Sequence, residues 1–187
     1  MNNYSPAASD GNTADGANTR AFLQQAVDHY PRLAAFSFTL KLPYREAVNE
    51  YRSLILRFHT EVWLHIGEYS RQRQQERHHS PPTVLRWMWE AASAPECKMV
   101  LMLNLDTLGT ERNPQLTDSA LQALNGIIAE AWQTVAGTAC TGVTSMAQNI
   151  ISRAGRDAFT TPFNRLKTRV QEMTLPVMTA RTGVIRL

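Results

Sequence analysis

The chain has 187 residues, of which 43% are hydrophobic and 19% charged, and its formal net charge is +3. These values are typical of one globular domain that buries a sizeable core. No segment approaches the roughly 20 apolar residues of a membrane span, and the first residues lack the basic and apolar regions of a signal peptide, so we expect a cytoplasmic protein.

The basic residues are concentrated toward the C-terminal end. Residues 1–152 carry 12 Lys and Arg against 14 Asp and Glu, a net charge of −2, whereas residues 153–187 carry 7 against 2, a net charge of +5. Arginine outnumbers lysine 16 to 3, and the planar guanidinium is the better ligand for phosphate. A basic segment of this kind indicates either polyanion binding or a solvated tail.

Neither the cysteines nor the histidines indicate a metal centre. Cys97 and Cys140 lie in apolar, strand-like surroundings without a CxxC partner, which favours buried reduced thiols over a disulfide. No histidine pair has metal-ligand spacing on a strand, and His78-His79 lies in a polar loop. A glycine-rich phosphate loop, HExxH and GxSxG are also missing from the sequence, so we expect no metal and no cofactor.

The first half of the chain begins with a polar arm and continues into a strand and a long helix. Residues 1–19 contain almost no large apolar side chains and are predicted to be disordered, so the folded domain is residues 20–187. A short helix is expected over 20–29, with Thr19 as its N-cap. Alternation in "AAFSFTLKLP" predicts a half-buried strand, and apolar residues three and four apart predict a helix over about 44–75.

The second half predicts a hairpin followed by a helix, a strand and a helix. The segments "TVLRWMWEAA" and "CKMVLMLN" flank the short linker "SAPE", which is typical of a β-hairpin. A helix is expected over 114–137, with Thr117 as N-cap and Gly137 as C-cap. The strand "TGVTSMAQNI" and the helix "TTPFNRLKTRVQEM" then precede a basic tail. This order predicts one α+β domain, an antiparallel sheet with helices on one face in a ferredoxin-like plan.

Strand alternation gathers polar side chains near the closed end of the hairpin. Glu96 and Lys98 share one side of their strand, and Arg86 and Glu90 share one side of the preceding strand. We expect these four residues to form a polar cluster, either a set of cross-strand ion pairs or part of a site. A lysine in such a cluster repels a metal ion and can neutralise the two acids.

The segments "AAFSFTLKLP", "LRWMWE", "ECKMVLMLN", "AEAWQTVAG", "FNRLKTRVQE" and "ARTGVIR" resemble, in this order, the YagK/YfjJ C-terminal domain family, also called inovirus gene 2 protein-like. The resemblance covers about residues 33–187. That family occurs in prophages and other mobile genetic elements and is similar to HUH rolling-circle replication initiators. It implies an HUH-like sandwich in which a His-x-His motif holds a divalent cation and a tyrosine attacks a scissile phosphate.

The chain keeps part of the family's pattern and departs from it at the reactive groups. The matching positions lie on the hairpin and at the start of the last helical motif: Trp87, Glu90, Asn104, Arg165 and Leu166. The two histidine positions correspond to Glu96 and Lys98, the tyrosine to Thr168 and the following lysine to Gln171. The resemblance therefore implies degenerate catalytic positions at Glu90, Glu96, Lys98 and Thr168, and a relative that does not nick DNA.

Two functions follow as hypotheses. The first is a catalytically inactive, DNA-binding protein of a phage or mobile genetic element, which uses the sheet face and the basic C-terminal segment. The expected nucleic-acid contacts are Lys41, Arg86, Lys98, Arg165, Lys167, Arg169, Arg181 and Arg186. The alternative is a protein-binding inhibitor or anti-defence module that reuses the fold on a host protein. Residual nicking activity is a third interpretation.

Overall fold

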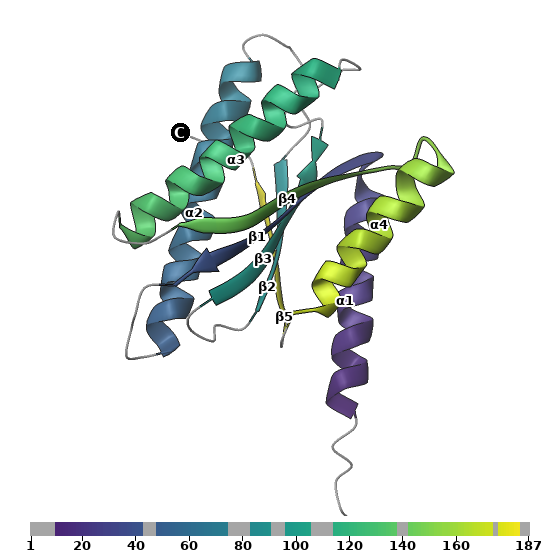
Figure 1. Ribbon diagram of the computed structural model, residues 1–187, viewed down its shortest axis with the longest axis horizontal. Helices are drawn as coiled ribbons and strands as arrows, with labels where there is room; N and C mark the ends of the chain where they lie inside the picture. The colour runs from purple at the N-terminus through teal and green to yellow at the C-terminus, as the bar shows by residue number, and fades with distance from the viewer. Residues whose placement is uncertain are drawn as a thin grey trace, which may run out of the picture.

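The computed structural model describes residues 10–42, 48–74, 83–90, 96–105, 114–137, 142–173 and 176–183. These residues form four helices and five strands (Figure 1). In chain order they are α1 (Asp10–His29), β1 (Arg32–Lys41), α2 (Val48–Gln74), β2 (Thr83–Glu90), β3 (Glu96–Asn104), α3 (Pro114–Ala136), β4 (Val143–Ser152), α4 (Arg156–Gln171) and β5 (Pro176–Gly183). Among the described helices, none combines the length and apolar character that a bilayer-spanning segment needs.

The five strands form one antiparallel sheet in the order β4-β1-β3-β2-β5. The first four strands, with α2 and α3 as crossovers, have the order of a ferredoxin-like βαββαβ unit, which confirms the predicted plan. The fifth strand extends the sheet beyond β2. We expected the segment after the last helix to be a tail; residues 176–183 of it instead pair with β2, from Glu90–Pro176 to Thr83–Gly183.

The larger core lies between the sheet and the helices α2 and α3. One face of each central strand supplies alternate apolar residues to it, including Phe36, Phe38, Trp87, Met99 and Leu101. The apolar stripes predicted for the two helices pack onto this face, and Phe58 of α2 makes edge contacts with Trp87 and with Trp132 of α3. Burial of these large side chains supplies much of the driving force for folding.

The opposite face of the sheet is covered by α1 and α4 (Figure 1). The expected placement of helices on one face therefore holds for α2 and α3 only. Each additional helix has its own apolar stripe, with Leu23, Ala26 and Val27 on α1 and Leu166 and Val170 on α4. These stripes meet the second set of alternate strand residues: Leu33, Ala35, Val84, Met88, Val100, Met102 and Ile151. The protein thus has three layers, with the sheet in the middle.

Several helix boundaries differ from the prediction. The first helix begins at Asp10, so residues 10–19 are helical where a disordered arm was expected, and residues 1–9 lie outside the described residues. A helix anchored on the sheet by its second half can extend toward its N-terminus, because each added residue gains a backbone hydrogen bond without a new nucleation step. Thr19 and Thr117 consequently lie inside α1 and α3 and are not N-caps.

Two backbone features shape the end of α3 and the edge strand β4. Gly137 follows α3 with φ of 86°, and its amide donates to the Gln133 carbonyl at 2.9 Å, which confirms the predicted C-cap. In β4 the pairing with β1 shifts between Ser37 and Thr39, and Ser145 there has φ of 53°. This bulge interrupts the ladder of an edge strand and limits pairing with another chain.

Candidate nucleic-acid interface

The residues of the predicted site lie on both faces of the hairpin strands. Trp87 points into the larger core, where it stacks on His59 with ring centroids 4.0 Å apart. Alternation along β2 and β3 places Arg86, Glu90, Glu96 and Lys98 on the opposite face, as predicted. Trp87 therefore has a packing role, and the polar positions belong to the face that α1 and α4 partly cover.

Four charged residues gather where β1 ends, β2 ends and β3 begins. Lys41 pairs with Glu96 across β1 and β3, and Thr39 pairs with Lys98. The Trp89–Met99 pair brings Glu90 next to Lys98 on the neighbouring strand. Glu96 and Lys98 are exposed, whereas Glu90 is buried. The structure thus joins Lys41 to the group that was expected from Glu90, Glu96 and Lys98.

Arg86 is not part of this charged group, which corrects the predicted four-residue cluster. It pairs with Met102, four residues along β3 from Lys98, which corresponds to roughly 13 Å at the rise of a β-strand. Its side chain is only 4% exposed and lies under the C-terminal end of α1. In this position the guanidinium faces His29 at the end of α1.

The charged group has the wrong chemistry for the metal site of a nicking enzyme. Glu90 and Glu96 supply carboxylates, but the two positions that the resemblance assigns to histidine hold a carboxylate and an ammonium group. No set of three metal-ligating side chains is found in the part of the chain that the structure describes. Two acids beside two lysines are typical of cross-strand charge pairing.

The basic residues of α4 lie on the solvent side of that helix. Leu166 and Val170 face the sheet, whereas Arg165 and Arg169 are exposed and Lys167 is half-buried. Thr168, at the former tyrosine position, is exposed, and its hydroxyl donates to the Asn164 carbonyl at 2.9 Å. This hydroxyl is thus engaged within its own helix turn.

Two further predicted contacts are placed only in part. Arg181 belongs to β5, where its backbone pairs with Leu85, and Arg186 lies outside the described residues.

Of the two cysteines, Cys97 is a buried free thiol, as expected, and Cys140 lies outside the described residues, as does the His78-His79 pair. Burial raises the pKa of Cys97 to about 12, and the negative charge of Glu90 adds to this increase.

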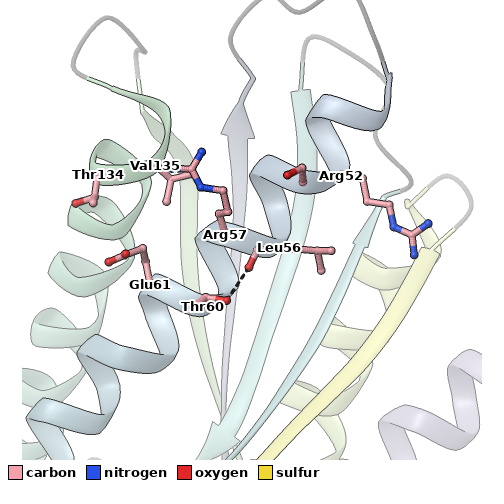
Figure 2. A pocket seen from close by; sticks show the side chains of 8 residues that line it. Arg52, Leu56, Arg57, Thr60, Glu61, Thr134 and Val135 are labelled. Atoms are coloured by element: carbon pink, nitrogen blue, oxygen red, sulfur yellow. Dashed lines mark hydrogen bonds between the residues drawn. The ribbon is translucent and has the colours of Figure 1, made fainter. Parts of the chain in front are cut away.

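A shallow groove between α2 and α3 was not predicted from the sequence (Figure 2). Its volume is about 640 Å³, and its lining includes Arg52, Leu56, Arg57 and Glu61 from α2 and Val135 from α3. Leu56 is 45% exposed at the groove, and Leu64, two turns further along the same helix, is 43% exposed. The signal for this surface was the presence of two leucines outside the stripe that packs on the sheet.

A family model described as uncharacterised conserved protein UCP030791 matches residues 9–148. The match covers more than half of the chain, so the chain belongs to this family. Its range includes α1, the hairpin and Arg86, and it ends within β4, before α4 and β5. No curated protein and no solved structure matches the chain.

Proposed function

We propose that this member of the UCP030791 family binds nucleic acid as a replication-initiator-like protein that no longer cuts its substrate. The proposal places it in the cytoplasm of a host, encoded by a phage or another mobile genetic element. The observation that carries the proposal is the exposed basic surface of α4. The resemblance to the YagK/YfjJ family supplies the class of nucleic-acid partner, which is DNA.

The charge of α4 is suited to a polyanion. The helix contains four cations, Arg156, Arg165, Lys167 and Arg169, against the single carboxylate of Asp157. Arg165 and Arg169 are one turn apart and exposed, so both guanidinium groups can contact successive phosphates of one strand. The other helices are less basic: α3 contains acidic residues and no Lys or Arg, α2 has four Arg against three Glu, and α1 has one Arg against three Asp. A polyanion is therefore attracted to α4 itself.

The loss of cutting is supported by the residues at the former reactive positions. Lys98 places a positive charge where the resemblance requires a neutral imidazole, and a metal ion there would be repelled. A threonine hydroxyl such as that of Thr168 is a weaker nucleophile and a poorer leaving group than a phenol. No general base is hydrogen-bonded to this hydroxyl in the described residues, because its partner is the Asn164 carbonyl.

Filter binding to single-stranded and hairpin DNA at two salt concentrations tests the proposal. We expect Arg165→Gln/Arg169→Gln to weaken binding on the order of tenfold and to reduce the slope of log K against log salt by about 1.4 for single strands. The matched control is Arg52→Gln/Arg57→Gln, which removes the same charge from the exposed side of α2 and should leave both quantities near wild type.

Two outcomes contradict the proposal. One is no DNA binding by the wild type even at low salt, and the other is an equal loss in the α2 control, which would indicate only non-specific attraction. Cutting is checked separately by incubating supercoiled DNA with Mg²⁺ or Mn²⁺. We expect no nicked product from wild type; a product that disappears in Glu90→Ala would show that the site still works.

The groove between α2 and α3 favours a second candidate, in which the protein binds a host protein. Leu56 and Leu64 offer apolar contacts on one side of α2, and Arg52 and Arg57 flank Leu56 with two positive charges. These features suit an amphipathic helix with acidic residues beside its apolar stripe. Leu56→Glu/Leu64→Glu should abolish a nuclease-resistant 1:1 complex, while Arg165→Gln/Arg169→Gln retains it. The reverse pattern would exclude this candidate.

A further inference from the structure

Arg86 is a buried cation whose hydrogen-bonding capacity is largely unused. Its Nη2 lies 2.6 Å from Nδ1 of His29, and its Nε and Nη1 have no hydrogen-bond partner. Only 4% of the residue is exposed. Burial of a guanidinium is unfavourable unless an anion or several acceptors replace the water that it loses. A buried arginine with two nitrogens lacking a partner therefore requires an explanation.

The described residues around Arg86 supply no carboxylate partner. In the sheet it is flanked by Met102 on β3 and Ala180 on β5. It contacts His29, the last residue of α1, and Tyr30, the next residue, whose ring centroid is 5.9 Å from the guanidinium carbon. Among the described residues, none places a carboxylate in an ion pair with Arg86. Since a guanidinium only donates, His29 must accept through Nδ1 and is neutral in this contact.

The position of His29 is important because of the shape of a guanidinium group. Its two bidentate edges are Nε with Nη2, and Nη1 with Nη2, so both include the nitrogen that His29 occupies. His29 is exposed at the end of α1, whereas Tyr30 beside it is buried. A rotation of the His29 side chain toward solvent would free a complete edge of Arg86 without moving the sheet.

We propose that Arg86 and Tyr30 form a binding site for a phosphate group, which displaces the His29 side chain from Nη2. A phosphate has enough oxygens to accept two N–H groups of Arg86 and the O–H of Tyr30 together. Burial raises the pKa of Tyr30, and the charge of Arg86 and its hydrogen bond to Tyr30 offset only part of this increase, so the phenol keeps its proton and can donate it. The site does not include Arg165 or Arg169, and it does not depend on nucleic-acid binding by α4.

Thermal unfolding of the full chain in phosphate and in chloride of equal ionic strength tests this site. Phosphate stabilises most folded proteins to some degree, so the readout is the difference between wild type and Arg86→Met. At about ten times the dissociation constant we expect phosphate to raise the wild-type midpoint by roughly 3 °C more than that of Arg86→Met. The control Arg71→Met, which removes one exposed arginine from α2 outside the groove, should respond like wild type.

Two conservative variants separate binding from packing. Tyr30→Phe keeps the ring and should bind phosphate several-fold more weakly, whereas His29→Ala removes the displaced side chain and should bind at least as tightly as wild type. Direct binding of ³²P-labelled phosphate by equilibrium dialysis gives these affinities even if a variant changes the midpoint. Equal responses of wild type and Arg86→Met, or no labelled phosphate bound, would overturn the proposal.

The source of the phosphate is identified by competition. A 5′-phosphorylated oligonucleotide that displaces labelled phosphate, where its unphosphorylated form does not, assigns the site to a nucleic-acid end. If inorganic phosphate displaces the labelled phosphate and neither oligonucleotide does, the site is assigned to the free ion. Arg165→Gln/Arg169→Gln should lose affinity for unphosphorylated DNA and keep the response to inorganic phosphate. This variant therefore distinguishes failure of the α4 proposal from failure of the Arg86 site.

Discussion

The thiol of Cys97 is held neutral by its burial in the larger core, on the side of β3 that faces α2 and α3. Its side chain has no exposed surface, and its thiol lies 3.6 Å from the Glu90 carbonyl oxygen. Burial raises its pKa from 9.0 to about 12. The unfolded chain thus loses this proton at a lower pH than the folded protein does. The stabilisation is complete below about pH 9 and is lost as the pH rises from 9 toward 12.

From this shift we expect the free energy of unfolding to fall by roughly 1.4 kcal/mol between pH 8 and pH 10 on account of Cys97. Urea unfolding at several pH values measures the fall. Cys97→Ala starts from a lower stability because it leaves a cavity, but its dependence on pH should be flatter by that amount. Identical slopes in the two proteins would contradict the assigned cause.

Two residues have a positive φ, and we expect substitutions at them to change the stability of the protein in opposite directions. Ser145→Gly relieves the left-handed strain at φ of 53° in the bulge, and we expect it to stabilise the protein by roughly 0.5 kcal/mol after the added chain entropy. Gly137→Ala introduces a side chain at φ of 86°, where nothing lies within 4 Å of the new Cβ. It should cost about 1 kcal/mol from backbone strain alone. Urea midpoints of the two variants check both signs.

Residue-scale prediction from the sequence succeeded for side-chain direction and failed for environment. The period of two correctly placed Trp87 on one face of the hairpin and Arg86 with Glu90 on the other. It could not show that α1 covers Arg86, because that contact joins residues 57 positions apart. The distance between Arg86 and Lys98 could not be predicted either, because alternation specifies the face of each side chain and does not determine the register between the two strands.

At the scale of elements, long periodic segments were predicted well and their ends less well. The helices α2 and α3 and the strands β1 to β4 appear where apolar spacing indicated them. The strand β5 was not predicted because its sequence has no clear alternation of apolar and polar residues. Its residues 176–180 are half-buried or exposed on both faces of the strand. Its structure depends on pairing with β2, which lies more than 80 residues earlier in the chain.

At the scale of the whole molecule, the order of the elements was sufficient to predict the ferredoxin-like unit. Consecutive strands joined by crossover helices and one hairpin admit few arrangements of a sheet. The second layer of helices was not predicted, because α1 and α4 flank the unit in sequence and their stripes do not specify a face. The result is an asymmetric molecule, with the basic helix α4 on one outer surface and the acidic helix α3 on the other.

The short attachment of α1 has a consequence for amide exchange. Where burial is described, α1 packs on the sheet through the buried side chains of Leu23, Ala26 and Val27 and the partly buried Phe22, whereas β1 is bonded to strands on both of its sides. Amides of α1 should therefore exchange through a local opening of low free energy, and those of β1 only on global unfolding. Each such opening uncovers Arg86, so phosphate should change exchange rates in α1 more than in β1.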